Sequence, residues 1–265
     1  MTDEGFVRRY GTWGVVAGAS EGLGAAWAEA LAVRGLNLVL LARRSEVLDA
    51  TAAAIRARHR IEVRTHPFDL AGASFASELE RLTESLEVGF GVFNAAHAPR
   101  GAFLDLSLEE QLRSVDVNCR GPLTMAHVLG RAMATRGRGG LVLMSSLAAF
   151  HGSPFIATYG ATKAFNLVLG EGLWFELQTR GVDVLACAAG ATRTPGFLKA
   201  SPRGEPGMVE PAQVVKEALG RLGHAGVMVP GGFNRFASFL MRRVLPRGTA
   251  VGILGKRTRN LTLPS

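Results

Sequence analysis

The amino-acid sequence predicts one α/β domain on a doubly wound, seven-stranded parallel sheet with helices on both faces. Short runs of apolar and β-branched residues alternate with longer helical runs along most of the chain. Most of the predicted strands are continuously apolar, which is typical of parallel strands covered on both faces. The length of 265 residues is sufficient for one such domain with a large core and too short for two.

The predicted elements follow one another in the order strand, helix, strand. We expect strands at Trp13–Ala17, Asn37–Ala42, Ile61–His66, Phe90–Asn94, Gly140–Ser145, Val182–Ala188 and Val227–Val229. We expect helices at Leu23–Arg34, Ser45–Arg58, Ser74–Glu87, Leu108–Arg136, Ala157–Arg180 and Pro211–Leu222. Because parallel strands need a crossover connection, usually a helix, this order predicts that successive strands run parallel.

Two segments depart from this alternation. Residues 192–210 are rich in Gly and Pro and follow the sixth predicted strand, so we expect a mobile loop at the carboxyl end of the sheet. Residues 233–265 form a basic, amphipathic C-terminal extension to a domain of residues 1–232.

The positive charge of the chain is confined to its C-terminal part. The net charge is +8, yet no acidic residue follows Glu217, and residues 218–265 contain eight Lys and Arg residues. The remainder of the chain is therefore neutral. A neutral body without a recognition motif argues against a nucleic-acid-binding protein.

The C-terminal extension has three interpretations. Apolar residues recur at helical spacing, with basic residues on the other faces: Phe233, Phe236, Leu240 and Val244, and Arg235, Arg242 and Arg243. The apolar stripe packs on the domain or on a second subunit, or it lies on an anionic membrane surface. Alternatively, the basic residues attract an acidic carrier or the phosphates of a CoA substrate.

Composition excludes several classes of protein. Cys119 and Cys187 lie far apart and outside any metal-binding pattern, which argues against a disulfide scaffold and a zinc site. The acidic N-terminus lacks the apolar stretch of a secretion signal, and no apolar run approaches the ~18–20 residues of a membrane span. We therefore expect a cytoplasmic protein, with peripheral membrane contact as its only association with lipid.

A glycine-rich turn connects the first predicted strand to the first predicted helix. Its spacing is G-x-x-x-G-x-G, at Gly18, Gly22 and Gly24. Such a turn lets the backbone approach a pyrophosphate, and the helix N-terminus supplies unpaired N–H groups. Tight packing of strand on helix would require the same glycines. The position of the turn favours dinucleotide binding by Gly18, Ser20, Glu21, Gly22, Leu23 and Gly24.

The end of the second predicted strand bears on which dinucleotide binds. Ala42 stands where an acidic residue would hold the ribose 2′-hydroxyl of NAD, and Arg43 and Arg44 follow. An arginine can pair with the 2′-phosphate of NADP. We therefore predict NADP(H) over NAD(H), with Arg43 as the main contact, although both arginines could simply be solvated. Asp69 and Leu70 follow the third strand, where the adenine would lie, but Asp is also an ordinary turn residue.

Three residues form a candidate catalytic group. Tyr159 precedes Lys163 by four residues, so that both share one helix face. A nearby cation favours phenolate, and this would give a proton donor and acceptor that works near neutral pH. Ser145 lies at the carboxyl end of the fifth predicted strand, which points into the crevice where such folds bind ligands.

With these motifs the chain resembles the classical short-chain dehydrogenase/reductase family, which has a Rossmann-type fold, over nearly its whole length. The matched features are Gly18-x-x-x-Gly22-x-Gly24, Asn94-Ala95-Ala96, Asn118, Ser145, Tyr159-x-x-x-Lys163 and Gly190-x-x-x-Thr194. The resemblance implies that Tyr159 is the general acid in carbonyl reduction and the general base in alcohol oxidation. It implies that Ser145 binds the carbonyl oxygen, and that Lys163 lowers the pKa of Tyr159 and binds the nicotinamide ribose.

The resemblance also assigns the remaining positions. Asn118 would hold a relay water, Asn94 would tie the central strand at the cofactor, and Thr194 would contact the carboxamide. Ala95, Ala96, Gly190 and Thr192 would complete the cofactor site. Three residues depart from the family pattern: Ala17 replaces a Thr, His97 occupies the last position of the Asn-Asn-Ala-Gly motif, and Ala189 replaces a Pro.

These residues predict an NADP(H)-dependent oxidoreductase that transfers hydride between nicotinamide and a carbonyl or alcohol. The candidate substrate contacts are mostly apolar: His97, Leu147, Phe155, Phe197 and Leu198. We therefore expect an apolar substrate, such as a 3-oxoacyl thioester or a steroid-like ketone, and a homodimer or homotetramer. The alternative is a regulatory or scaffold protein that binds NADP(H) without turnover. We predict no metal site.

Overall fold

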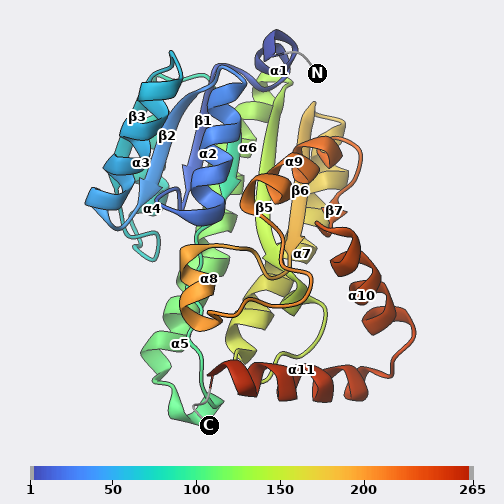
Figure 1. Ribbon diagram of the computed structural model, residues 1–265. Coiled ribbons are helices and arrows are strands. Elements are labelled where there is room, and N and C mark those ends of the chain that lie inside the picture. Colours follow the sequence, from blue (N-terminus) through green and yellow to red (C-terminus); the bar gives the residue numbers. More distant parts are fainter. Residues whose placement is uncertain (1–2, 263–265) are drawn as a thin grey trace.

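The computed structural model of the chain describes residues 3–262, so residues 263–265 of the predicted extension lie outside the described residues. Seven parallel strands form one sheet in the order β3-β2-β1-β4-β5-β6-β7 (Figure 1). Their bounds are Trp13–Ala17 (β1), Asn37–Ala42 (β2), Val63–Pro67 (β3), Val88–Phe93 (β4), Gly139–Ser146 (β5), Val182–Ala189 (β6) and Val227–Met228 (β7). The predicted fold class is confirmed.

Helices cover both faces of the sheet. One face packs against α2 (Gly22–Val33), α3 (Ser45–Arg58) and α9 (Pro211–Arg221). The opposite face packs against α4 (Phe75–Thr83), α6 (Gly121–Arg136) and α7 (Ala157–Gln178). The strand order reverses between β1 and β4, and in doubly wound sheets the carboxyl ends of the strands at this point form the ligand crevice.

The helix predicted over Leu108–Arg136 is divided by a turn of π-helix. It consists of α5 (Leu108–Val115), the π-helical segment Asp116–Arg120 and α6. A π-turn widens the helix and often occurs at functional sites. The segment contains Asn118, one of the predicted catalytic residues.

An additional helix, α1 (Asp3–Tyr10), precedes the first strand and was not predicted. Phe6 and Tyr10 are buried in the core cluster on the α2 face. The Tyr10 hydroxyl and the Arg9 guanidinium both donate to Asp183 Oδ2, at 2.7 Å and 2.6 Å. These contacts attach the N-terminal segment to the beginning of β6.

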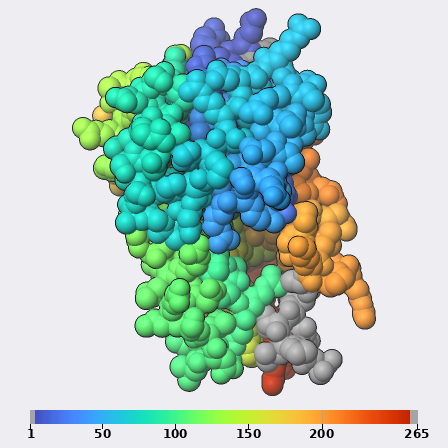
Figure 2. Space-filling model, turned by 90° about the vertical axis from the view of Figure 1, so that its left-hand side faces the viewer, coloured from blue at the N-terminus to red at the C-terminus, as the bar shows by residue number. Residues whose placement is uncertain are grey.

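The segments after β6 and β7 lie together at the carboxyl end of the sheet (Figure 1). Residues 192–210 contain a short helix, α8 (Pro195–Ala200), and this region forms part of the outer surface, in orange in Figure 2. The C-terminal extension forms α10 (Gly232–Arg243) and α11 (Arg247–Thr262). None of the described helices is long and apolar enough to cross a membrane.

The C-terminal extension packs on its own domain. Asn234 and Ser238 of α10 and Ala250 of α11 are buried. The Asn234 side chain donates to the carbonyl oxygens of Gly207 and Pro230, at 3.0 Å and 3.2 Å. The apolar stripe does not supply most of this packing: Phe236 is 66% and Val244 59% exposed, because α10 turns small and polar residues inward. A second subunit or a membrane surface as the partner of the stripe stays a prediction.

Candidate active site

The glycine-rich turn lies tightly against the end of β4. Gly18 has φ +84°, and a Cβ there would lie 2.5 Å from the Ala95 nitrogen; at Gly24 it would lie 1.8 Å from the Gly18 oxygen. Asn94 Nδ2 donates to that same Gly18 oxygen at 3.0 Å. Close packing therefore requires Gly18 and Gly24, and the Asn94 side chain ties the end of β4 to the turn.

The same turn has the features of a pyrophosphate site. Gly22 has φ +59° and faces Thr194, whose Cγ2 would lie 2.9 Å from a Cβ there. Glu21, the residue before α2, makes no side-chain cap to the helix, so the first N–H groups of α2 remain available to an anion. The backbone cradle and the uncapped helix end fit a dinucleotide cofactor.

Arg43 and Arg44 are both exposed after β2, but only Arg44 is paired. Arg44 lies 2.8 Å from Glu21, whereas Arg43 has no ion-pair partner among residues 3–262. The charge of Arg43 nonetheless reaches Asp69 and contributes to lowering the pKa of that carboxyl group. Arg43 is therefore the arginine whose charge is uncompensated at the predicted ribose position.

Asp69 and Leu70, the predicted adenine contacts, make contacts with other residues of the protein. Asp69 Oδ2 accepts from Arg113 of α5 at 2.7 Å, and Oδ1 accepts from the Ala71 nitrogen at 3.1 Å. Burial acts to raise the pKa of Asp69, but these hydrogen bonds and the Arg113 charge hold it below its ordinary value. The Leu70 side chain is buried in the core, which leaves only its backbone for a ligand.

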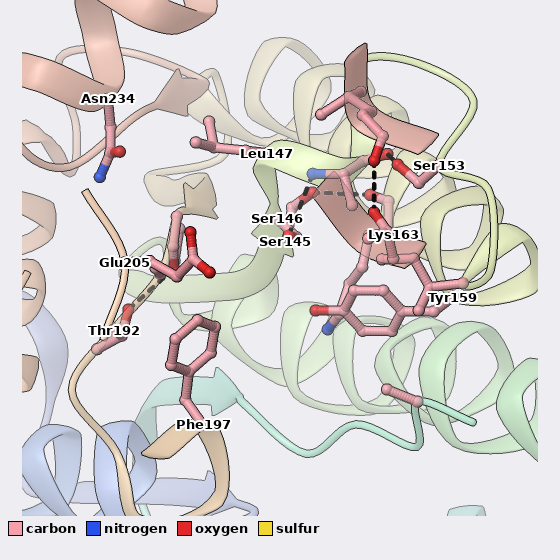
Figure 3. A pocket seen from close by; sticks show the side chains of 18 of the residues that line it. Ser145, Ser146, Leu147, Ser153, Tyr159, Lys163, Thr192, Phe197, Glu205 and Asn234 are labelled. Carbon is pink, nitrogen blue, oxygen red and sulfur yellow. Dashed lines mark hydrogen bonds between the residues drawn. The ribbon is translucent and has the colours of Figure 1, made fainter. Parts of the chain in front are cut away.

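Tyr159 and Lys163 project from the first turns of α7 into the same region (Figure 3). Lys163 is buried, its Nζ lies 5.7 Å from the centre of the Tyr159 ring, and it donates to the Met144 oxygen at 2.8 Å. Burial lowers the pKa of Lys163 to about 8. This depression brings the lysine close to neutrality at mildly alkaline pH.

The influences on Tyr159 differ from the prediction. Burial raises the pKa of Tyr159, while a hydrogen bond with Ser146 and the charge of Arg100 oppose that rise. The resemblance assigned the lowering effect to Lys163. In the structure it comes from Ser146 and Arg100, whereas the Lys163 ammonium donates to the backbone oxygen of Met144.

The two serines at the end of β5 have different partners (Figure 3). Ser145 is buried, and its hydroxyl donates to the Lys163 oxygen at 2.7 Å. Ser146 makes the hydrogen bond with Tyr159, and its Oγ accepts from the Ala148 nitrogen at 3.2 Å. The hydroxyl beside Tyr159 is therefore that of Ser146, which we did not predict. Successive strand residues face opposite sides, so strand alternation was the signal that could distinguish them.

Asn118 is fully buried in the π-helical turn and binds two neighbouring segments. Its Oδ1 accepts from the His97 nitrogen at 2.8 Å. Its Nδ2 donates to the His97 oxygen at 2.8 Å and to Thr162 Oγ1 at 3.0 Å. Asn118 thus fixes the loop after β4 relative to α7, where Tyr159 is located.

A cavity of about 620 Å³ opens above these side chains. At one end it is lined by predicted cofactor residues: Glu21, Gly22, Leu23, Asn94, Ala96, Gly190, Thr192 and Thr194. Thr194 is also the N-cap of α8, where its Oγ1 accepts from the Phe197 nitrogen at 3.2 Å. The other predicted cofactor residues, among them Ser20 and Ala95, lie in the turn beneath and at the sheet edge.

Two of the five predicted substrate residues line the cavity, namely Leu147 and Phe197. His97 does not: its Nε2 lies 2.8 Å from Glu110 Oε2 on α5. Phe155 has φ +64° and faces a small separate hollow beside Phe103. Leu198 is absent from the lining as well. These three predictions are not supported, since long-range packing directs the side chains elsewhere.

The C-terminal helices supply much of the remaining wall. The lining residues from α10 and α11 are Phe233, Asn234, Ala237, Ser238, Met241, Arg242, Ile253, Leu254, Arg257 and Thr258. Arg257 forms an ion pair with Glu205 of the 192–210 segment at 2.7 Å, and the Arg242 guanidinium lies 4.2 Å from the centre of the Phe150 ring. The sequence connected this extension with the substrate only through its basic residues, in one of three interpretations, and did not indicate that its apolar residues line the cavity.

Comparison with known proteins identifies the family. A sequence model described as short chain dehydrogenase matches residues 12–203. The chain is 32% identical over 256 residues to a 7beta-hydroxysteroid dehydrogenase of Clostridium sardiniense, which covers 95% of this chain and 97% of the relative. The chain belongs to the short-chain dehydrogenase/reductase family.

Solved structures of other short-chain dehydrogenases share the fold. A 7beta-hydroxysteroid dehydrogenase structure has a TM-score of 0.89 and 30% identity, covering 94% of this chain and 98% of that one. A short-chain dehydrogenase from Sphingobium yanoikuyae in complex with NADPH has a TM-score of 0.74 and 32% identity, covering 82% and 86%.

This short-chain dehydrogenase/reductase is an oxidoreductase that acts on CH–OH and C=O groups, as predicted. The lining of the cavity beside Tyr159 is mainly apolar. The similarity offers no support for a protein that binds a cofactor without turnover.

Proposed function

We propose that this enzyme is an NADP(H)-dependent reductase of bulky apolar ketones, and a dehydrogenase of the matching alcohols, with steroid-like ketones as its substrate class. The supporting observation is that Ser146, Tyr159 and Lys163 open into a cavity of about 620 Å³ whose outer wall is α10 and α11. A cavity of this size is ample for a drug-sized apolar ligand. The likeness to the 7beta-hydroxysteroid dehydrogenase structure covers 94% of the chain.

The side chains provide position and a proton. A bound nicotinamide coenzyme supplies the hydride for the carbonyl carbon. The Tyr159 hydroxyl gives its proton to the carbonyl oxygen, and the Ser146 hydroxyl donates a hydrogen bond to that oxygen. Burial raises the pKa of Tyr159 and so keeps the phenol protonated at neutral pH, which suits reduction. Asn118 holds the two segments that frame this group.

NADP(H) is proposed over NAD(H) because of Arg43. Its guanidinium is exposed at the end of β2 and has no acidic partner among the described residues, unlike Arg44. We expect Arg43→Ala to weaken NADPH binding much more than NADH binding. Arg44→Ala is the matched control, since Arg44 is already paired with Glu21. Equal losses for both coenzymes in Arg43→Ala would contradict the assignment.

Two partner predictions remain proposals. Apolar side chains on α5 and α7 are exposed, among them Leu108 at 72%, Val168 at 65% and Phe175 at 70%. We propose that this face forms the interface of a homodimer or homotetramer. Contact of the exposed face of α10 with a membrane surface stays a prediction.

The function is tested by NADPH oxidation with a panel of steroid ketones, aromatic ketones and 3-oxoacyl thioesters. Wild type should oxidise NADPH with the steroid ketones, and Tyr159→Phe should lower kcat by about 10²-fold or more. Coenzyme fluorescence should show that Tyr159→Phe still binds NADPH. A wild-type protein that binds NADPH but reduces no ketone would instead be a regulatory or scaffold protein.

A further inference from the structure

The cavity wall contains more positively charged than negatively charged side chains. Its two carboxylates are both neutralised, since Glu21 pairs with Arg44 at 2.8 Å and Glu205 pairs with Arg257 at 2.7 Å. Two further arginines line the cavity, Arg100 and Arg242. Neither has an ion-pair partner in the part of the chain that the structure describes. The substrate side therefore contains uncompensated positive charge in mainly apolar surroundings.

Arg242 is held in a defined place. It lies in the last turn of α10, and its guanidinium carbon lies 4.2 Å from the centre of the Phe150 ring, a cation–π contact. The neighbouring His151 is hydrogen-bonded to the backbone of Met241. Phe150, His151 and Met241 also line the cavity. The guanidinium is thus positioned in the wall by its neighbours while its hydrogen-bond donors are left without a carboxylate.

The potential around this position is positive. Burial lowers the pKa of His151, and the charges of Arg247 and Arg242 lower it further. No acidic residue follows Glu217, so α10 and α11 contain nothing that would neutralise these arginines. A wall of this kind attracts and orients an anionic group.

We propose that Arg242 binds an anionic substituent of the substrate, so that the preferred ketone is a bulky apolar molecule that also carries a carboxylate or phosphate. The inference rests on the proposed function, because it assigns the substrate class of the same cavity. Arg242 is then a specificity residue: it contacts the substrate away from the reacting carbonyl, which Tyr159 and Ser146 contact.

The test compares two ligands that differ only in charge. A steroid ketone with a carboxylate on its side chain and the methyl ester of that compound are titrated calorimetrically into the NADPH-loaded enzyme, in the Tyr159→Phe background to prevent turnover. Wild-type Arg242 is compared with Arg242→Gln and Arg242→Lys. The matched control is Arg243→Gln, which removes an adjacent exposed charge from α10 that does not line the cavity.

We expect the acid to bind about tenfold more tightly than the ester, a preference that Arg242→Gln abolishes and that Arg242→Lys and Arg243→Gln retain. Equal binding of acid and ester, binding of neither, or a preference that persists in Arg242→Gln would overturn binding of a carboxylate by Arg242, and the anchor is overturned altogether if binding of a 3-oxoacyl-CoA is also independent of Arg242. A 3-oxoacyl-CoA in the same titrations distinguishes phosphate from carboxylate: dependence on Arg242 with this ligand alone would support the anchor with phosphate as the anion.

The outcomes separate this proposal from the proposed function. If the acid binds through Arg242 but the enzyme with Tyr159 intact oxidises no NADPH with it, the anchor stands and the ketone reductase assignment fails. If ketones are reduced but acid and ester perform alike and binding of the 3-oxoacyl-CoA does not depend on Arg242, the reductase assignment stands and the anchor fails.

Discussion

The hydroxyls of Ser145 and Ser146 serve different purposes although the residues are adjacent in β5. Ser145 donates to the backbone oxygen of Lys163 and so fixes α7 against the sheet, whereas Ser146 makes a hydrogen bond with the phenol of Tyr159. From these partners we infer that the Ser145 hydroxyl contributes to stability and that the Ser146 hydroxyl contacts the substrate oxygen. Their substitutions should therefore affect different measurements.

We predict that Ser146→Ala lowers kcat by on the order of 10²-fold, because the carbonyl oxygen loses a hydrogen-bond donor. Ser145→Ala should retain most of kcat and lower the free energy of unfolding by about 1 kcal/mol, through loss of a buried hydrogen bond. Steady-state kinetics and urea unfolding of both variants measure this. A larger loss of kcat in Ser145→Ala than in Ser146→Ala would restore Ser145 as the carbonyl-binding residue.

The buried lysine should make stability depend on pH. Lys163 has a folded-state pKa of about 8 against an ordinary value of 10.5, so between these pH values the unfolded chain binds more protons than the folded chain. The free energy of unfolding should therefore rise with pH across this interval, by up to about 3 kcal/mol. Lys163→Met should lack this rise. The measurement is denaturant unfolding of wild type and Lys163→Met at several pH values. If the free energy of unfolding changes with pH in the same way in both proteins, the prediction for Lys163 is wrong.

At the scale of single residues, the sequence located side chains better than it located their partners. Tyr159, Lys163 and Asn94 lie where local spacing and the family motifs indicate. His97 and Asp69 are bound by Glu110 and Arg113 of α5. Neither pairing is indicated by a local sequence pattern or by a family motif. Strand alternation turns the hydroxyls of Ser145 and Ser146 to different sides, but which of the two reaches the Tyr159 phenol is decided by tertiary packing.

At the scale of elements, the 192–210 segment and α11 form a connected lid. Arg257 of α11 donates two hydrogen bonds to Glu205 Oε2, at 3.1 Å and 2.7 Å, and Glu205 is 13% exposed. Both residues line the cavity. The ion pair therefore restrains the segment that borders the cavity, because it links two elements that follow different strands.

We predict that Arg257→Gln raises KM for the ketone several-fold with a smaller effect on kcat, since the wall loosens while the catalytic group is untouched. The control is Lys256→Gln, which removes an adjacent exposed charge outside the lining. Limited proteolysis should also cut residues 192–210 faster in Arg257→Gln than in the control. Equal kinetics and cleavage in the two variants would show that the ion pair restrains nothing.

The sequence patterns predicted the bounds of the strands better than the details of the helices. The strands were predicted to within two residues because continuous apolar runs between turn residues mark buried strands. The π-turn at Asp116–Arg120 was missed, since helical periodicity continues on both sides of it. Which face of α10 meets the domain was not evident from the sequence. Phe233, Phe236 and Phe239 are about 60% exposed, and hydrophobicity alone does not reveal that small and polar residues pack inward.

At the scale of the whole molecule, an exposed apolar face on α5 and α7 predicts self-association. Val168 and Phe175 lie seven residues apart on one side of α7, and both are more than 60% exposed. We expect the double variant Val168→Glu/Phe175→Glu to be monomeric by light scattering, where wild type is dimeric or larger. Val33→Glu, at an exposed position on α2, is the control. A wild-type monomer would refute the interface.

The order of the elements along the chain has a consequence for biosynthesis. All seven strands, the glycine turn and the Tyr159 group are complete by Met228, whereas α10 and α11 come last. Because the chain is synthesised from its N-terminus, the residues of the coenzyme end of the site are made before the helices that line the substrate side of the cavity. A chain that ended at Met228 would contain the glycine turn and the Tyr159 group but would lack α10 and α11, which line the substrate side of the cavity.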